Sequence, residues 1–209
     1  GLTKVLLRYQ GRRATENVLA MAESQMAVNA DELDAHPLLL NAINGTIDLD
    51  TGQLRETQPD HLLTKTMPIR CEPMRGCPRW MQFISEVTSG DEEIAGLLQR
   101  AVGYSLTGEV SEQKLFFLYG DGSNGKSTFV NTVARILGSD YARGMLPNSL
   151  TGTNSSRHVS IADLCGARMV YCSELDRGGH FDENLIKQVT GGDLLRGRML
   201  YEHPFEFEP

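Results

Sequence analysis

The sequence contains no uncharged apolar stretch near the roughly 20 residues that a membrane-spanning helix needs. Its first residues, Gly-Leu-Thr-Lys, lack the charged start and apolar core of a secretory signal peptide. Cysteine is scarce, and the four that are present show neither a CxxC pair nor a histidine at zinc-finger spacing: Cys71, Cys77, Cys165 and Cys172. These absences argue against a membrane protein and a structural zinc site, and we expect a cytoplasmic protein with reduced thiols.

Positive charge is also in short supply. The chain has 20 Lys and Arg against 27 Asp and Glu, a net charge of −7, and no basic block stands out. Composition alone therefore does not suggest a nucleic-acid partner, and any contact with DNA must be local. With 209 residues, 40% of them hydrophobic, the chain can bury a core, which excludes a disordered or fibrous protein.

The pattern along the chain predicts three parts, a leading helical segment (1–35), a small α+β, mainly helical domain (36–110) and a larger α/β domain (111–209). In the middle part, Asn44-Gly45 between apolar runs predicts a hairpin. Apolar residues at helical spacing predict two helices that follow it, with Ser89 and Glu92 as a capping box for the second: Trp80, Phe83, Ile84 and Val87, then Ile94, Leu97, Leu98 and Ala101.

In the third part, residues 115–119 form a continuous apolar run, which is typical of a strand buried on both faces of a parallel sheet. Gly120 to Ser127 follows at once and fits G-x-x-x-x-G-K-[ST], the P-loop motif. A helical pattern then continues to Gly138. Strand, glycine-rich loop and helix in this order form the structural context that the motif requires.

The chemistry of this motif is phosphate binding, because glycines let backbone N–H groups approach a phosphate and the helix N-terminus adds positive charge. We expect Lys126 to bridge the β- and γ-phosphates of ATP and Ser127 to bind Mg²⁺. The full set of predicted nucleotide-binding residues is Gly120, Asp121, Gly122, Ser123, Asn124, Gly125, Lys126, Ser127 and Thr128.

A second strand is predicted at residues 168–172. Ligands of parallel sheets lie beyond the carboxyl ends of the strands, so Glu174 is the candidate for the catalytic carboxylate and a second Mg²⁺ ligand. Ser173 stands where an Asp-Glu pair would have its first acid, so Glu174 serves alone or Asp176 assists it.

Three motifs in this order, the P-loop, residues 164–174 and Lys187-Gln188-Val189-Thr190-Gly191-Gly192-Asp193, resemble superfamily-three helicases. More closely, they are similar to phage and plasmid primase-helicases related to the poxvirus type, over residues 20–209. The resemblance implies an AAA+-like P-loop ATPase sheet and an ATP- and Mg²⁺-dependent motor. Such motors assemble as rings, usually hexamers, around single- or double-stranded DNA, and replication proteins are further candidate partners.

The resemblance also implies DNA-binding residues: Lys187, Arg196, Arg198 and His203. The segment from Leu194 to Phe207 is similar to the central-channel hairpin of these helicases, with the turn near residues 201–204 and the two phenylalanines returning on one face. Six copies would form a basic ring although each chain is acidic. The alternative is that the two arginines form surface ion pairs and that His203 is a solvated turn residue.

The sequence departs from the family at its ends. It starts without Met and stops at Pro209, before the family's sensor strand and arginine finger, so we expect a C-terminally truncated sheet and an incomplete, poorly behaved ATPase. No primase domain is visible. The alternatives to a helicase motor are an inert fragment or prophage remnant that binds nucleotide only, and a small-molecule kinase, which Thr190-Gly191-Gly192-Asp193 disfavours.

Overall fold

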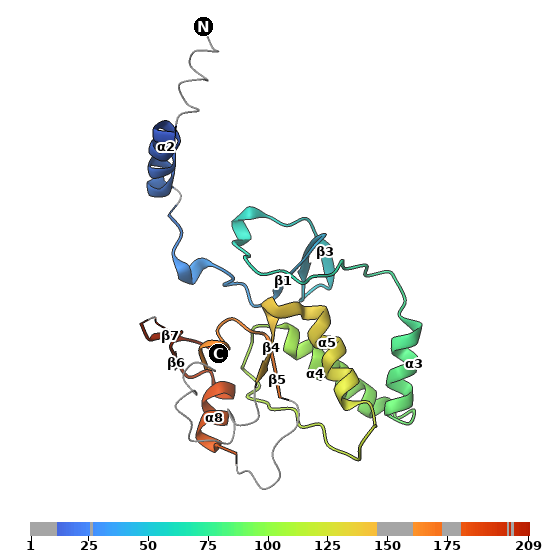
Figure 1. The fold of residues 1–209 in the computed structure, drawn as a ribbon. Helices are drawn as coiled ribbons and strands as arrows, with labels where there is room; N and C mark the ends of the chain where they lie inside the picture. Colours follow the sequence, from blue (N-terminus) through green and yellow to red (C-terminus); the bar gives the residue numbers. More distant parts are fainter. Residues whose placement is uncertain (1–11, 26, 146–160, 173–180, 200, 202) are drawn as a thin grey trace.

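The computed structural model describes residues 12–25, 27–145, 161–172, 181–199, 201 and 203–209, which form a mixed α/β structure with one small parallel sheet (Figure 1). The helices are α2 (Arg12–Gln25), α3 (Pro78–Val87), α4 (Glu92–Leu106), α5 (Lys126–Tyr141) and α8 (Glu183–Gly191). The strands are β1 (Leu39–Ala42), β2 (Gly45–Asp48), β3 (Gln53–Arg55), β4 (Ala142–Met145), β5 (Met169–Cys172), β6 (Leu195–Gly197) and β7 (Phe205–Phe207).

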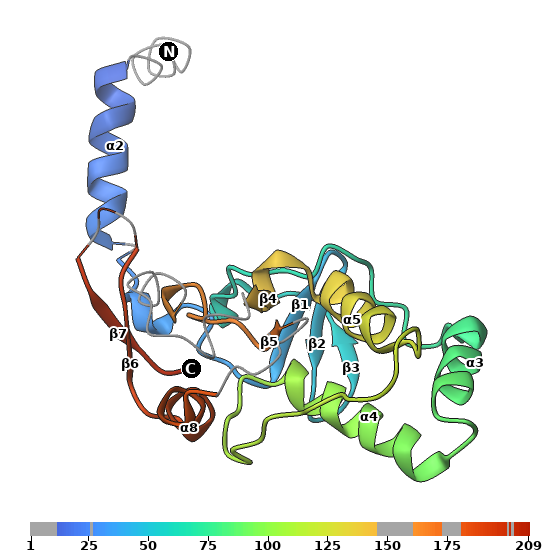
Figure 2. The ribbon, with the colours of Figure 1, turned by 60° about the horizontal axis from the view of Figure 1, so that its bottom comes forward.

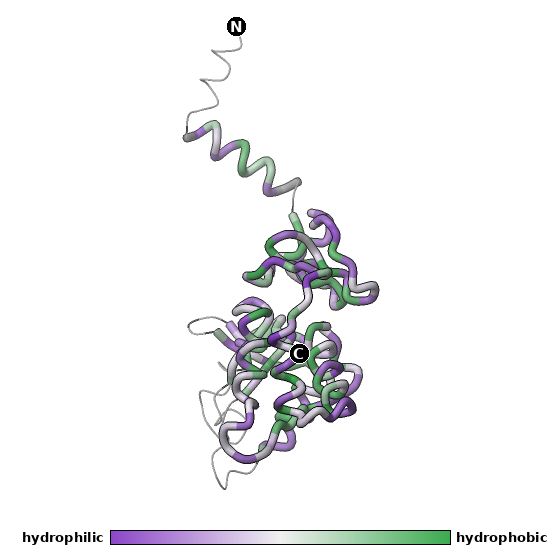
Figure 3. Tube along the Cα trace, turned by 90° about the vertical axis from the view of Figure 1, so that its right-hand side faces the viewer, coloured by the Kyte–Doolittle hydropathy of each residue, from purple (hydrophilic) through white to green (hydrophobic). Residues whose placement is uncertain are grey.

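Helix α2 lies apart from the rest of the chain, joined to β1 by a connection that contains a short 3-10 helix, Ala30–Glu32 (Figures 1 and 3). Its apolar side chains Val18, Leu19 and Met21 are exposed. Within the expected leading segment, residues 12–25 are helical, and the bounds of that segment stay a prediction. Within the described ranges, none of the helices combines the length and the apolar composition that crossing a membrane requires.

The predicted hairpin at residues 38–49 is present as β1 and β2, and β3 extends it into a three-stranded antiparallel sheet. The turn lies one residue earlier than expected, at Ile43 and Asn44, because Ala42 pairs with Gly45. Gly45 has φ +147°, and a Cβ there would lie against the carbonyl oxygen of Arg55. This position therefore needs glycine for both conformational and packing reasons.

The main core joins this sheet to α5, which lies beside it (Figure 2). Its buried members come from β1, the loop after β3, and α5 with β4: Leu40, Ala42, Met67, Val133, Ala134, Leu137, Tyr141 and Ala142. The cluster thus takes residues from both sides of position 110. The boundary that the sequence suggests there stays a prediction, and this core ties the two segments together.

Gly138 breaks the regular conformation of α5, as its place at the end of the predicted helix suggests. Its φ of +70° and ψ of −178° interrupt the helix, which resumes to Tyr141. A Cβ on Gly138 would lie 2.5 Å from Cδ of Pro68. The kink lets the loop after β3 pack against the C-terminal turn of α5.

The predicted strand at residues 168–172 is confirmed as β5, and it pairs in parallel with β4. The predicted strand at residues 115–119 is wrong for the described structure, because these residues form no strand and all five side chains are exposed. A strand buried on both faces needs neighbours on its edges and layers over both sides. Among the described strands, β4 and β5 pair only with each other, so residues 115–119 have no such neighbours.

Two polar side chains connect β5 and α5 to the antiparallel sheet. The Arg168 guanidinium donates hydrogen bonds to the carbonyls of His36 (3.1 Å), Leu39 (2.6 Å) and Leu106 (2.8 Å), and it lies 5.1 Å from the centre of the Tyr141 ring. Burial lowers the pKa of Arg168, while the nearby Tyr141 opposes that shift. The carbonyls replace the water that this cation loses.

The Tyr141 hydroxyl accepts a hydrogen bond from the Asn41 amide at 3.2 Å and donates one to the Lys65 carbonyl at 3.1 Å. Burial raises the pKa of Tyr141, because the phenolate would lose its hydration. The folded state therefore favours the neutral phenol. This preference stabilises the fold below the unfolded pKa of 10.0 and is lost as the pH rises through the folded pKa.

We expect Tyr141→Phe to lower the free energy of unfolding by about 1–2 kcal/mol at pH 8, because two backbone groups lose their partner. The deficit should shrink above about pH 10, where only the wild-type side chain ionises. Urea unfolding of both proteins from pH 8 to 11 measures it. A deficit that is constant over this range would contradict the assigned burial of the phenol.

Candidate functional site

The P-loop leads directly into α5, as predicted. Helix α5 begins at Lys126, and Gly125 is its N-cap with φ +88°, a left-handed conformation that favours glycine. The first hydrogen bond at this helix start runs from the Phe129 amide to the Gly125 carbonyl, at 2.9 Å. The amides of residues 126–128 precede it, so they have no helical acceptor and point to the loop end of the helix.

Lys126 folds back over the loop. Its Nζ donates hydrogen bonds to the carbonyl oxygens of Gly120 and Asp121, both at 2.9 Å, and to Oδ1 of Asn124 at 2.6 Å. A Cβ on Gly120, where φ is +140°, would lie 2.5 Å from Nδ2 of Asn124. The ammonium group is therefore held at the centre of the loop by weak neutral acceptors, which an anion can replace.

The loop itself is open to solvent. Asp121, Gly122, Ser123 and Asn124 are exposed, and a Cβ on Gly122 would meet no heavy atom within 4 Å. Ser123 has φ +61°. Amides of the first turn of a helix, a lysine ammonium and free space beside them fit a phosphate group.

Of the two predicted Mg²⁺ ligands, Ser127 lies within the described residues and Glu174 does not. Ser127 and Thr128 lie exposed on the first turn of α5, and a serine hydroxyl is among the oxygen ligands that Mg²⁺ accepts. Glu174, together with Ser173 and Asp176, lies outside the described residues, after β5. In the described part of the chain, no three His, Cys, Asp or Glu side chains come together as a metal site. The Ser127 and Glu174 assignments stay predictions.

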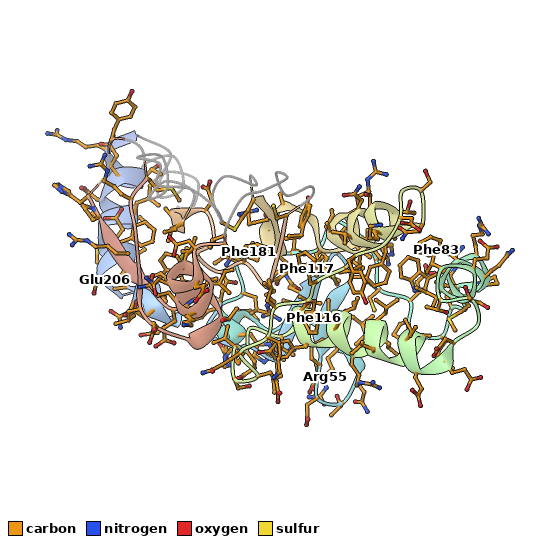
Figure 4. All side chains as sticks on the ribbon, turned by 90° about the horizontal axis from the view of Figure 1, so that it is seen from below. Arg55, Phe83, Phe116, Phe117, Phe181 and Glu206 are labelled. Atoms are coloured by element: carbon orange, nitrogen blue, oxygen red, sulfur yellow. The ribbon has the colours of Figure 1, made fainter. Side chains whose placement is uncertain are left out.

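The predicted hairpin near the C-terminus is present as β6 and β7. Leu195 pairs with Phe207, Arg196 with Glu206 and Gly197 with Phe205 (Figure 4 labels Glu206). Leu195 and Phe207 are buried in a second core with Ile161, Leu164 and Leu185. Side chains of β6 thus alternate between two faces, because Leu195 and Gly197 are buried and Arg196 is exposed.

The four predicted DNA-binding residues are all exposed. Arg196 lies on β6 opposite Glu206, and Arg198 follows the strand. His203 lies before β7. Lys187 lies on α8, where its Nζ is 3.9 Å from a carboxylate oxygen of Glu183, one turn earlier. Two of the four cations thus have a carboxylate nearby, Lys187 on its own helix and Arg196 on the paired strand.

Sequence reasoning missed two features of the site. The apolar spacing of α3 predicts a helix but not that its Phe83 and Val87 contact the P-loop at Gly125. Sequence reasoning also assigned no role to Arg168, which anchors the start of β5. The i, i+4 spacing of Phe83 and Val87 placed them on one face, yet no local signal shows which element that face meets.

Comparisons with known proteins point to viral helicases. A family model described as "D5 N terminal like" matches residues 1–89. A protein of Acanthamoeba polyphaga mimivirus that carries the name "Putative helicase" is 28% identical over 187 residues. The alignment covers 85% of this chain and 19% of the mimivirus protein, so the chain spans about a fifth of that relative's length. The two matches support a relationship to phage or viral primase-helicases.

Proposed function

We propose that the chain is the ATP-binding and ATP-hydrolysing motor part of a replicative DNA helicase of phage or plasmid type. The observation that carries the proposal is the P-loop, an exposed glycine-rich loop in which Lys126 lies over the loop carbonyls at the start of α5. The similarity to the mimivirus helicase favours a motor on DNA over other P-loop enzymes. Bound ATP with Mg²⁺ would supply the reactive phosphoanhydride, and the loop would bind and orient it.

In this proposal each group has a distinct task. Lys126 exchanges its loop carbonyls for phosphate oxygens, Ser127 binds Mg²⁺, and Glu174 orients the attacking water. Lys187 and the exposed side of the β6–β7 hairpin face the DNA. Ring assembly, usually as a hexamer, would repeat Arg196 and Arg198 around a central channel.

The alternative is a protein that binds nucleotide without turning it over. ATP hydrolysis by the purified complete protein, measured with and without single-stranded DNA, separates the two. We expect DNA-stimulated turnover that Glu174→Gln removes while ATP binding persists. Binding without turnover would favour the alternative.

The arginines of the hairpin give a second test. We expect Arg196→Ala with Arg198→Ala to weaken single-stranded DNA binding and to reduce the salt slope of log K by about 0.7 per lost phosphate contact. Measuring DNA affinity from 50 to 200 mM salt by fluorescence anisotropy checks it, with exposed Arg135→Ala on α5 as the matched control. An unaltered slope would remove these arginines from the DNA path.

A further inference from the structure

Helix α3 closes one side of the P-loop, although more than 30 residues separate the two along the chain. A Cβ on Gly125 would lie 2.6 Å from Cγ1 of Val87 and 3.2 Å from Cε2 of Phe83. Figure 4 shows Phe83 on the side of α3 that faces α5. Gly125 thus packs directly against α3 where the loop turns into the helix.

A second contact holds the start of α5 against the same helix. Trp80 stacks on Phe129, with ring centres 5.7 Å apart and an angle of 18° between the planes, and its ring centre is 5.4 Å from that of Phe83. Phe129 is 7% exposed and donates its amide to the Gly125 carbonyl. The contacts of α3 with Gly125 and with Phe129 therefore hold both ends of the first hydrogen-bonded turn of α5.

The rest of the loop lacks comparable support in the described structure. Gly122 has open space around it, and the preceding residues 115–119 are exposed, although Phe116 makes an edge contact with Tyr104 and Phe117 with Phe181, before the loop begins. Lys126 reaches only acceptors of the loop itself. The position of the loop relative to the body of the protein therefore depends on its contact with α3.

We propose that α3 positions the P-loop for phosphate binding, with Phe83 and Val87 as positioning residues that act through Gly125, and that Trp80 senses whether the loop is occupied. This inference rests on the proposed binding of ATP. A phosphate draws Lys126 away from the carbonyls of Gly120 and Asp121, and the loop then rearranges against Val87. Because Trp80 stacks on the first turn of α5, its environment changes in the same step.

The test compares two equal truncations. Val87→Ala removes the contact with Gly125, whereas Val102→Ala makes the same change on α4, where Val102 packs against the main core. We expect both to lower the melting temperature by a few degrees. Only Val87→Ala should raise the Kd for a fluorescent ATP analogue, by roughly three- to tenfold, the range expected for contacting residues.

Trp80 is the only tryptophan of the chain, so its emission reports on this contact alone. We expect the emission to change on ATP addition with the same Kd as the analogue, and Val87→Ala to reduce the amplitude at saturation. A purely structural role of Val87 would change the melting temperature and leave this amplitude intact.

The outcomes are distinguishable. If wild type binds ATP and the Val87 variant binds it equally well, or Val102→Ala weakens binding as much, α3 does not position the loop and this inference is wrong. If wild type binds no ATP at all, the proposed function fails and this inference fails with it.

Discussion

Lys126→Ala is expected to lower the affinity for ATP by about two orders of magnitude or more while leaving the fold intact. The reason is that Nζ is the cation of the loop and, among the described residues, hydrogen-bonds to two loop carbonyls and the Asn124 side chain. Charge-assisted hydrogen bonds to phosphate are each worth about 1.5–3 kcal/mol, and the variant loses them. The fold is unaffected, because the exposed loop carbonyls form hydrogen bonds with water when the lysine is absent. Titration with a fluorescent ATP analogue measures the loss.

Two further measurements sharpen this result. Exposed Lys114→Ala, before the apolar run, should bind ATP as wild type does and so controls for charge alone. The melting temperature of Lys126→Ala should stay within about 2 °C of wild type, since no buried group changes. Unchanged affinity in the Lys126 variant would refute the P-loop assignment.

Arg168→Met is expected to have the largest effect on stability, with a loss of about 3 kcal/mol and a fall of about 6–12 °C in melting temperature. Three carbonyls, of His36, Leu39 and Leu106, lose a donor at once, and the contact with the Tyr141 ring is lost. Methionine keeps much of the volume, so the effect reports on hydrogen bonds and charge more than on a cavity.

Thermal and urea unfolding of matched variants test this expectation. Arg168→Lys should recover part of the loss, because an ammonium keeps the charge but does not span three acceptors in the plane of a guanidinium. Arg135→Met, an exposed arginine on α5, should change the free energy of unfolding by less than about 0.5 kcal/mol. If Arg168→Met had the same melting temperature as wild type, the three carbonyls would form hydrogen bonds with water in place of Arg168, and the expectation would be wrong.

Local patterns predicted the helices better than their ends. The apolar spacing located α3 and α4, but the expected capping box of Ser89 and Glu92 is wrong. Asp91 caps α4 instead, accepting hydrogen bonds from the amides of Glu93 and Ile94. Ser89 has φ +54° in the preceding turn, so its hydroxyl does not reach the helix start. Several side chains near a boundary can serve as a cap, and backbone geometry selects one.

The sequence predicted some strands correctly and one incorrectly. Both hairpins were predictable, because their partners are adjacent in sequence and the alternation of β6 and β7 marks which face is buried. The apolar run at residues 115–119 also reads as a strand, yet it is exposed and unpaired among the described strands. Burial of such a run depends on partner strands that are distant in sequence, and the composition of the run does not show whether those partners are present.

By itself the sequence determined where the P-loop turns into a helix, since glycines and the lysine at fixed spacing act within eight residues. Only the tertiary structure decided what stands around that loop. Val87 against Gly125 and Arg168 against three carbonyls join segments that are 38 to 132 residues apart. Such contacts depend on how whole elements pack, and packing has no periodic signature in the chain.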